Sequence, residues 1–251
     1  MVGLRSSWEI HSKSARLGLM CEDKDANDGE QGIDFSVLPY EDWIEVVFNR
    51  PVSKHPWAGI EFAFEPRVPA VLIEHLTRMC LEFASLRPRF SWEEIDQGVW
   101  SALTYPVESV MLLFRESIPL DVRLSCIKAM YKVFSGTVCK IKEDISNITC
   151  FYMWWDLVGF EFCGQRNEHK KAVFIPQEKS DQELQDTIFE TLVRILKLDD
   201  TKCRKSALHG LSHLHHPKGA DVVQSFIDSH GGEYTEEEIK WMQGCRDGMV
   251  L

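Results

Sequence analysis

The feature that most constrains the fold is a run of apolar residues at helical spacing between Leu184 and Ile227. In three successive stretches, apolar residues recur every three or four positions, as they do on one face of an amphipathic helix. They are Leu184, Ile188, Leu192, Ile195 and Leu196; then Cys203, Ala207, Leu208, Leu211 and Leu214; then Ala220, Val223, Phe226 and Ile227. An acidic turn at Asp199-Asp200 and a turn at His216-Pro217 separate the stretches. The pattern predicts three short helices in a row, arranged as hairpins rather than around a pocket.

The same stretch resembles a HEAT repeat. The resemblance rests on the apolar first helix, the aspartate in the turn, Cys203-Arg204 at the usual Val-Arg, and then Ala207-Leu208, Gly210-Leu211 and Pro217. It is clear over about 183–229 and moderate over 107–135, but the turn before Cys203 is one residue short and the region around Trp154 does not match. The resemblance implies an all-α fold, a right-handed α-α superhelix of stacked helical hairpins of HEAT or armadillo type.

The chain also repeats itself at an offset of 81 residues, because 121–130 aligns with 202–211. The offset is about twice the ~40-residue length of a HEAT or armadillo unit. Helix pairs that cannot bury an apolar face alone stack on neighbouring pairs, and repetition supplies those neighbours. We therefore expect a single helical repeat domain over 36–251, with 36–65 as an irregular N-terminal cap.

The N-terminal residues 1–35 have a different composition. Residues 21–34 contain six acidic residues against one lysine. Asp23, Asp25 and Asp28 suggest a calcium loop, but the sixth place of an EF-hand loop requires glycine and the chain has Asp28 there. A segment of this kind buries too little apolar surface to fold alone, so we expect a mobile acidic arm over 1–35.

The composition indicates which cellular compartment and which classes of partner are compatible with this sequence. The net charge of −11 opposes binding to nucleic acid, which needs a field of the opposite sign, and it suits a protein partner of basic character. The eight cysteines include no CxxC pair and fit a reducing compartment better than a disulfide framework. The sequence has neither a signal-peptide core nor an apolar run of membrane-spanning length. We expect a cytoplasmic protein without a membrane partner.

Local signals predict where several helices begin. Three capping boxes, Ser91-x-x-Glu94, Ser180-x-x-Glu183 and Thr235-x-x-Glu238, each predict a helix start. The segment 145–164 is apolar on nearly all sides, which indicates a buried helix. The periodicity of 42–48 does not distinguish a helix from a strand.

A cluster of histidines is the candidate metal site. His209 and His213 lie four residues apart and share a helix face, with His216 nearly beneath them, and two imidazoles on one turn can grip Zn²⁺. In the internal alignment His209 pairs with Lys128 and His213 with Lys132, so both are expected at solvent positions. We prefer a polar helix surface without metal. A metal-dependent hydrolase or lyase using His209, His213 and His216 is the alternative.

Two aligned arginines and an aromatic run have two interpretations each. Arg123 and Arg204 are expected to pair with turn aspartates (Asp121, Asp199 or Asp200) as a packing device, rather than to form an anion-binding ladder. Trp154 and Trp155, with Tyr152, lie at helical spacing in an apolar segment. Such aromatics are more often core than interface, and they become the best partner-binding patch only if exposed.

We found no motif for nucleophilic catalysis or phosphate binding, so we expect neither an enzyme nor a cofactor. The preferred function is a non-catalytic scaffold that binds another protein or a peptide on the curved surface of the helical array. A HEAT-like enzyme that excises damaged bases is disfavoured by the acidic charge. The candidate binding residues, on the concave face, are Lys128, Lys132, Arg123, Arg204, His209, His213, Trp154 and Trp155.

Overall fold

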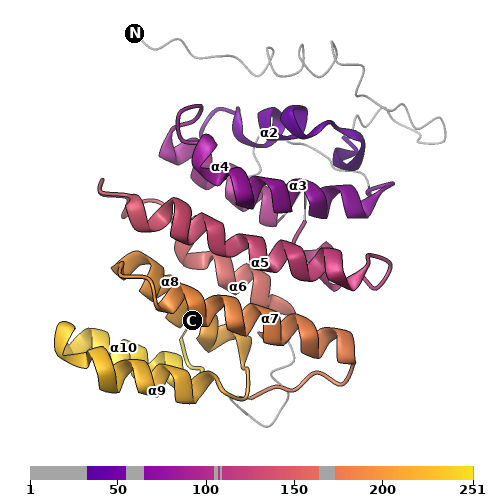
Figure 1. Ribbon diagram of the computed structural model, residues 1–251. Coiled ribbons are helices and arrows are strands. Elements are labelled where there is room, and N and C mark those ends of the chain that lie inside the picture. The colour runs from indigo at the N-terminus through magenta and orange to yellow at the C-terminus, as the bar shows by residue number, and fades with distance from the viewer. Residues whose placement is uncertain (1–32, 55–64, 105–106, 108, 164–172, 251) are drawn as a thin grey trace. The chain divides into compact units, whose positions relative to one another are not determined.

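The computed structural model describes residues 33–54, 65–104, 107, 109–163 and 173–250, and its regular structure is helical throughout (Figure 1). These residues form nine α-helices and several short 3-10 turns, and no β-strand occurs among them. The prediction of an all-α chain is therefore confirmed. The expected acidic arm, 1–35, lies outside the described residues as far as residue 32. No helix in the described ranges combines the length and the apolar character needed to cross a bilayer.

The chain divides into two compact units. The first comprises the described parts of Met1–Leu76 together with Ser85–Ile118, and the second comprises Thr77–Ala84 together with Pro119–Leu251. Helix α3 (Pro69–Glu82) therefore belongs to the first unit up to Leu76 and to the second unit from Thr77.

In the first unit, α2 (Tyr40–Phe48) packs on α4 (Trp92–Leu103). The segment whose periodicity was ambiguous is thus a helix, although it lies in the expected irregular cap. The two helices meet closely at Gly98, where an added Cβ atom would lie 2.2 Å from the Phe48 ring. Arg50 follows α2, is buried, and donates to the Ser101 hydroxyl at 2.6 Å; burial lowers the pKa of its guanidinium to about 10.

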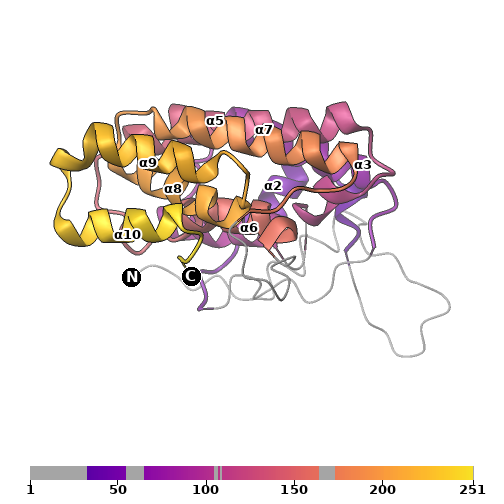
Figure 2. The same ribbon diagram turned by 90° about the horizontal axis from the view of Figure 1, so that it is seen from below.

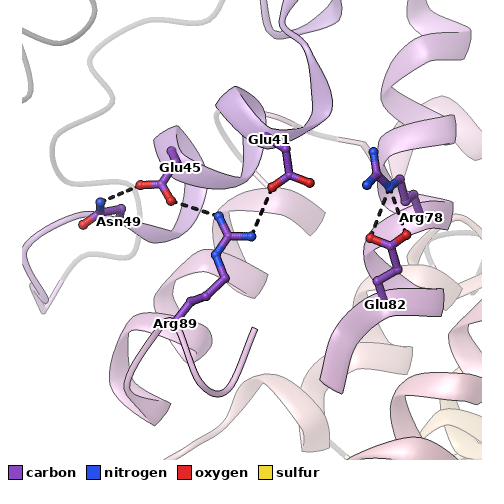
Figure 3. A network of polar contacts seen from close by, with 6 residues as sticks. All are labelled: Glu41, Glu45, Asn49, Arg78, Glu82 and Arg89. Atoms are coloured by element: carbon purple, nitrogen blue, oxygen red, sulfur yellow. Dashed lines mark hydrogen bonds and ion pairs between the residues drawn. The ribbon is translucent and has the colours of Figure 1, made fainter. Parts of the chain in front are cut away.

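Ion pairs connect the surface of α2 to the turn that precedes α4 (Figure 3). Arg89 in that turn lies 3.2 Å from a Glu41 carboxylate oxygen and 2.9 Å from one of Glu45, and Asn49 donates to Glu45 at 2.6 Å. The pair drawn between Arg78 and Glu82 is separate and spans one turn within α3. Exposed pairs of this kind contribute about 0–1 kcal/mol each to folding stability. The packing of α2 on α4 therefore depends mainly on buried apolar contacts.

Two of the three predicted helix starts are correct. Ser91 and Thr235 form complete capping boxes at α4 and α10 (Glu236–Arg246). The prediction at Ser180 is wrong, because α7 (Lys179–Leu196) begins two residues earlier than a cap at Ser180 requires, with Glu178 at the N-cap. Gln182 explains the shift: its side-chain amide donates to the Pro176 carbonyl at 2.8 Å, which fixes the incoming loop against the first turn.

The second unit is a stack of helices in two layers. It contains α5 (Leu120–Gly136), α6 (Cys150–Cys163), α7, α8 (Thr201–Leu214), α9 (Gly219–His230) and α10. Within it α5 packs on α7, α6 packs on α8, α7 pairs with α8, and α10 pairs with α9 and also packs on α8. Figure 2 shows α5, α7 and α9 along one side of this unit and α6, α8 and α10 along the other.

This arrangement corrects the internal sequence alignment. The alignment equates α5 with α8, but α5 lies beside α7 whereas α8 lies beside α6. The two aligned helices are three helices apart in the chain, so they fall in opposite layers of an alternating stack (Figure 2). The two segments align because their apolar residues have the same spacing. That spacing does not indicate which of the two layers a helix belongs to.

The core of the second unit lies between α6, α7 and α8. Trp154 and Trp155 of α6 are fully buried, and Phe134 of α5 contacts both rings. Gly210 of α8 permits the closest approach, since a Cβ atom there would lie 2.4 Å from the Cβ of Trp155 and 2.8 Å from a methyl carbon of Leu192. The buried-helix prediction is thus confirmed for the part of α6 (Cys150–Cys163) whose side chains are described, where Cys150, Phe151 and Val158 are buried together with the two tryptophans.

Candidate functional site

A groove of about 660 Å³ lies on the second unit among α7, α8 and α9. Helix α7 contributes Phe189, Val193 and Leu196 to its lining, and α9 contributes Val222 and Phe226. The remaining lining residues are polar or charged: Lys197, Arg204, Lys218, Asp221, Ser225 and His230. The groove is thus an apolar channel with charged groups along its margins.

The groove exists because the last hairpin packs differently from the one before it. Helix α7 packs along α5, its neighbour in the same layer, but α9 does not pack closely against α7. The contacts of α9 are instead with α8 and α10. Apolar residues of α7 and α9 therefore border a groove between the two helices, in which Phe189, Val193 and Val222 are half-buried and Leu196 and Phe226 are buried.

One wall of the groove is held by His216. Its ring stacks on Phe189 with centroids 3.9 Å apart, and its Nε2 lies 2.9 Å from Oδ1 of Asp186. The Lys218 backbone N–H donates to Nδ1 of the same ring at 3.1 Å. Because Nδ1 accepts, the proton of the neutral ring lies on Nε2, where it is donated to the carboxylate. His216 therefore fixes both the Phe189 side chain and the turn that carries Lys218.

The opposite wall is organised around Phe226 and Arg204. The Phe226 ring stacks on His230 at 4.6 Å, and the Arg204 guanidinium carbon lies 5.8 Å from the centre of the Phe226 ring. Arg204 also pairs with Asp199 at 3.2 Å and Glu233 at 3.1 Å. The predicted pairing of Arg204 with a turn aspartate is confirmed, and it connects the α7–α8 turn to the 3-10 turn η5 (Gly231–Glu233).

Two lysines give the margins of the groove a positive charge. Lys197 is the C-cap residue of α7 and Lys218 is the N-cap residue of α9, and both are exposed. In the part of the chain that the structure describes, neither ammonium group has a hydrogen bond or an ion pair. Asp221 is the one carboxylate among the lining residues, so lysine charge exceeds carboxylate charge at the margins.

The other predicted binding residues lie away from this groove. Lys128 and Lys132 are exposed on α5, as the sequence analysis expects, and Arg123 on the same helix is 3% exposed. Trp154 and Trp155 are fully buried, which supports their interpretation as core and leaves no exposed face for a partner. Of the candidate residues from the sequence, Arg204 alone lines the groove.

His209 is not a solvent residue, and this prediction is wrong. It is fully buried, its ring stacks on Tyr152 at 4.3 Å, and its Nδ1 lies 3.3 Å from the Tyr152 carbonyl oxygen. The error follows from the alignment with Lys128, because α8 presents to α6 the face that α5 presents to water. Burial, followed by the charge on His213, lowers the pKa of His209.

The three histidines of the metal alternative do not form one ligand set. Nε2 of His213 lies 3.0 Å from Nε2 of His209, whereas His216 contacts Asp186 and Phe189 as described above. Over the described ranges, no group of three or more His, Cys, Asp or Glu residues has the arrangement needed to hold a metal ion. The geometry therefore does not support a site built from His209, His213 and His216.

Sequence reasoning missed the apolar lining of the groove, although a signal was available. On α7 the core stripe runs through Leu184, Ile188 and Leu192. Phe189, Val193 and Leu196 form a second stripe at spacings of four and three residues, beside the first. An apolar face wider than one neighbouring helix requires indicates surface left for another contact.

The groove offers a ligand two kinds of interaction. Its floor supplies apolar contact from rings and branched side chains, and its margins supply ammonium groups on mobile stems. In comparisons with protein-family models, with curated proteins and with solved structures, none matches this chain.

Proposed function

We propose that this protein is a non-catalytic binding module that holds a peptide segment of another protein in the groove between α7 and α9. The observation that carries the proposal is the second apolar stripe of α7, which faces the groove instead of a neighbouring helix. Peptide segments dock by placing apolar anchors at successive helical or extended positions in such a groove. A volume of about 660 Å³ falls within the range of ligand pockets, roughly 300–1,000 Å³.

The packing of the second unit supports a finer proposal about architecture. Successive helices alternate between two layers, and α5–α7 and α6–α8 are same-layer neighbours. This is the contact pattern of stacked helical hairpins, so we propose a HEAT- or armadillo-like superhelix as the form of the array. Repeat arrays bind partners along surfaces that neighbouring repeats share, and the groove spans α7 and α9 of adjacent hairpins.

We also place the binding module in the cytoplasm. Six cysteines of the described ranges, Cys80, Cys126, Cys139, Cys150, Cys203 and Cys245, are free, and five of these six are buried. Buried free cysteines behave as small hydrophobes and need no oxidant to fold.

The proposal is tested by panning a phage-displayed library of random linear peptides on the full chain. Peptides that use the groove should bind the native chain and lose binding to Val222→Glu, because a carboxylate in the apolar floor must be desolvated when a peptide docks. Leu81→Glu is the matched control, since Leu81 is 58% exposed on α3 and does not line the groove. Thermal unfolding of both variants checks that each is folded.

Loss of binding in Val222→Glu with retention in Leu81→Glu supports the groove as the binding site. Equal binding to both variants, or a panning experiment that enriches no peptide, overturns the proposal.

A further inference from the structure

We infer that the partner segment is acidic and amphipathic, with apolar side chains that fill the groove and carboxylates that meet Lys197 and Lys218. This inference rests on the proposed function and adds the charge of the partner to it. The expectation of a basic partner came from the net charge of the whole chain, −11, whereas a docked peptide experiences the charges at the groove itself.

The local charge of the groove is opposite to that of the chain. Arg204 is already paired with Asp199 and Glu233, so its charge is largely compensated. Lys197 and Lys218 lack such partners among the described residues, and Asp221 offsets part of their charge. Charge complementarity at an interface directs partner choice and association rate more than it directs affinity. An acidic segment is the partner that this margin favours.

The position of Lys218 strengthens the argument. It occupies the N-cap of α9, makes no side-chain capping bond there, and places a positive charge at the positive end of the helix dipole. Ser, Thr, Asp and Asn are preferred at this position, because their side chains accept from free backbone N–H groups. A lysine at this position does not stabilise the helix. A carboxylate of a partner placed there would interact favourably with both the ammonium group and the N-terminus of the helix.

Lys218 is also held in place from behind. Its backbone N–H donates to His216, whose ring stacks on the groove residue Phe189. The base of the Lys218 side chain and the apolar wall are therefore fixed to one another through a single imidazole. A partner segment that fills the groove beside Phe189 passes close to the base of the lysine.

The test uses the peptides recovered by panning and measures their dissociation constants by calorimetry. Lys197→Glu/Lys218→Glu reverses both charges at the margin. Lys128→Glu/Lys132→Glu is the matched control, because it makes the same chemical change at two exposed lysines of α5, in the same unit and outside the groove. Both double variants shift the net charge of the chain by the same amount, so a general electrostatic effect appears in both.

We expect the enriched peptides to carry an excess of Asp and Glu beside apolar anchors. Their dissociation constants should rise about tenfold in Lys197→Glu/Lys218→Glu, the effect of reversing two partly exposed pairs, and about twofold or less in the control. Raising the salt concentration should weaken binding to the native chain and have less effect on the groove double variant.

Each other outcome has a definite meaning. Peptides that depend on Val222 but show no acidic excess, or that bind the two double variants equally, overturn the acidic partner and leave the binding groove standing. Peptides that do not discriminate Val222→Glu overturn the proposed function, and the inference falls with it.

Discussion

Nε2 of His209 and Nε2 of His213 lie 3.0 Å apart, so one of the two rings donates a hydrogen bond to the other. Nδ1 of His209 faces the Tyr152 carbonyl oxygen and must carry a proton, which leaves Nε2 of a neutral His209 as the acceptor. His213 therefore donates from Nε2. Its Nδ1 lies 3.3 Å from Oδ1 of Asp156.

This arrangement predicts that acid destabilises the protein through His209. Burial, and then the charge on His213, lowers the pKa of His209 in the folded protein, so below pH ~6.5 the unfolded chain binds a proton that the folded chain does not. The contribution of His209 is fully present above that pH. It falls by up to about 1.4 kcal/mol per pH unit below it, until the folded-state pKa is reached.

The measurement is the free energy of unfolding between pH 7 and pH 5 for the native chain and for His209→Gln. We expect a shallower decline in the variant. Leu81→Gln, an exposed substitution that removes no titratable group, should follow the native pH dependence. Parallel curves for the native chain and His209→Gln would contradict the assignment.

Gly210→Ala should destabilise the second unit. The added methyl group would lie 2.4 Å from the Cβ of Trp155, and overpacking of a core typically costs about 1–3 kcal/mol. The gain in helix propensity, about 1 kcal/mol, offsets only part of this. Gly136→Ala is the control because a Cβ atom there meets nothing within 4 Å. Denaturant unfolding should separate the two, and equal stabilities would show that α6 moves freely away from α8.

Alanine substitutions at Thr235 and Ser180 should destabilise the protein by different amounts. Thr235→Ala removes a complete capping box at α10 and should cost about 1 kcal/mol. Ser180→Ala should cost less than ~0.5 kcal/mol, because Ser180 lies inside α7 and does not cap it. Thermal unfolding of the two variants measures the difference, and a larger loss from Ser180→Ala would place the start of α7 elsewhere.

Thiol labelling should distinguish the cysteines of the second unit. Burial raises the pKa of Cys126 to about 12 and that of Cys245 to about 12, so at pH 8 only about one thiol in ten thousand is ionised. We expect both to react at least about a hundredfold more slowly than the half-buried Cys139, as followed by peptide mass spectrometry. The rates should converge in denaturant. Fast labelling of Cys126 in native buffer would contradict the packing of α5.

The sequence predicted helix positions better than helix partners. Ser91 and Thr235 correctly predict the starts of α4 and α10, because a capping box is a local interaction between residues three apart in the sequence. His209 was misplaced because its burial depends on α6, which is distant in sequence, and on the layer that α8 joins. Apolar spacing specifies which face of a helix is buried but not which helix buries it.

The groove illustrates the same limit. Phe189 and Val193 were visible as apolar residues beside the core stripe of α7. That they border a groove depends on α9 packing on α8 and α10 rather than on α7, which no local pattern encodes. Lys197 and Lys218 can be recognised as binding candidates only after the structure shows that they line the groove.

The contact between Gly98 and Phe48 in the first unit has a consequence for sequences descended from a common ancestor with this one. The ring of Phe48 occupies the space in which a side chain at position 98 would lie. The two positions therefore share one volume, and neither can vary without regard to the other. Among such sequences we expect a larger residue at 98 to occur together with a smaller one at 48, a correlated substitution recoverable from an alignment alone.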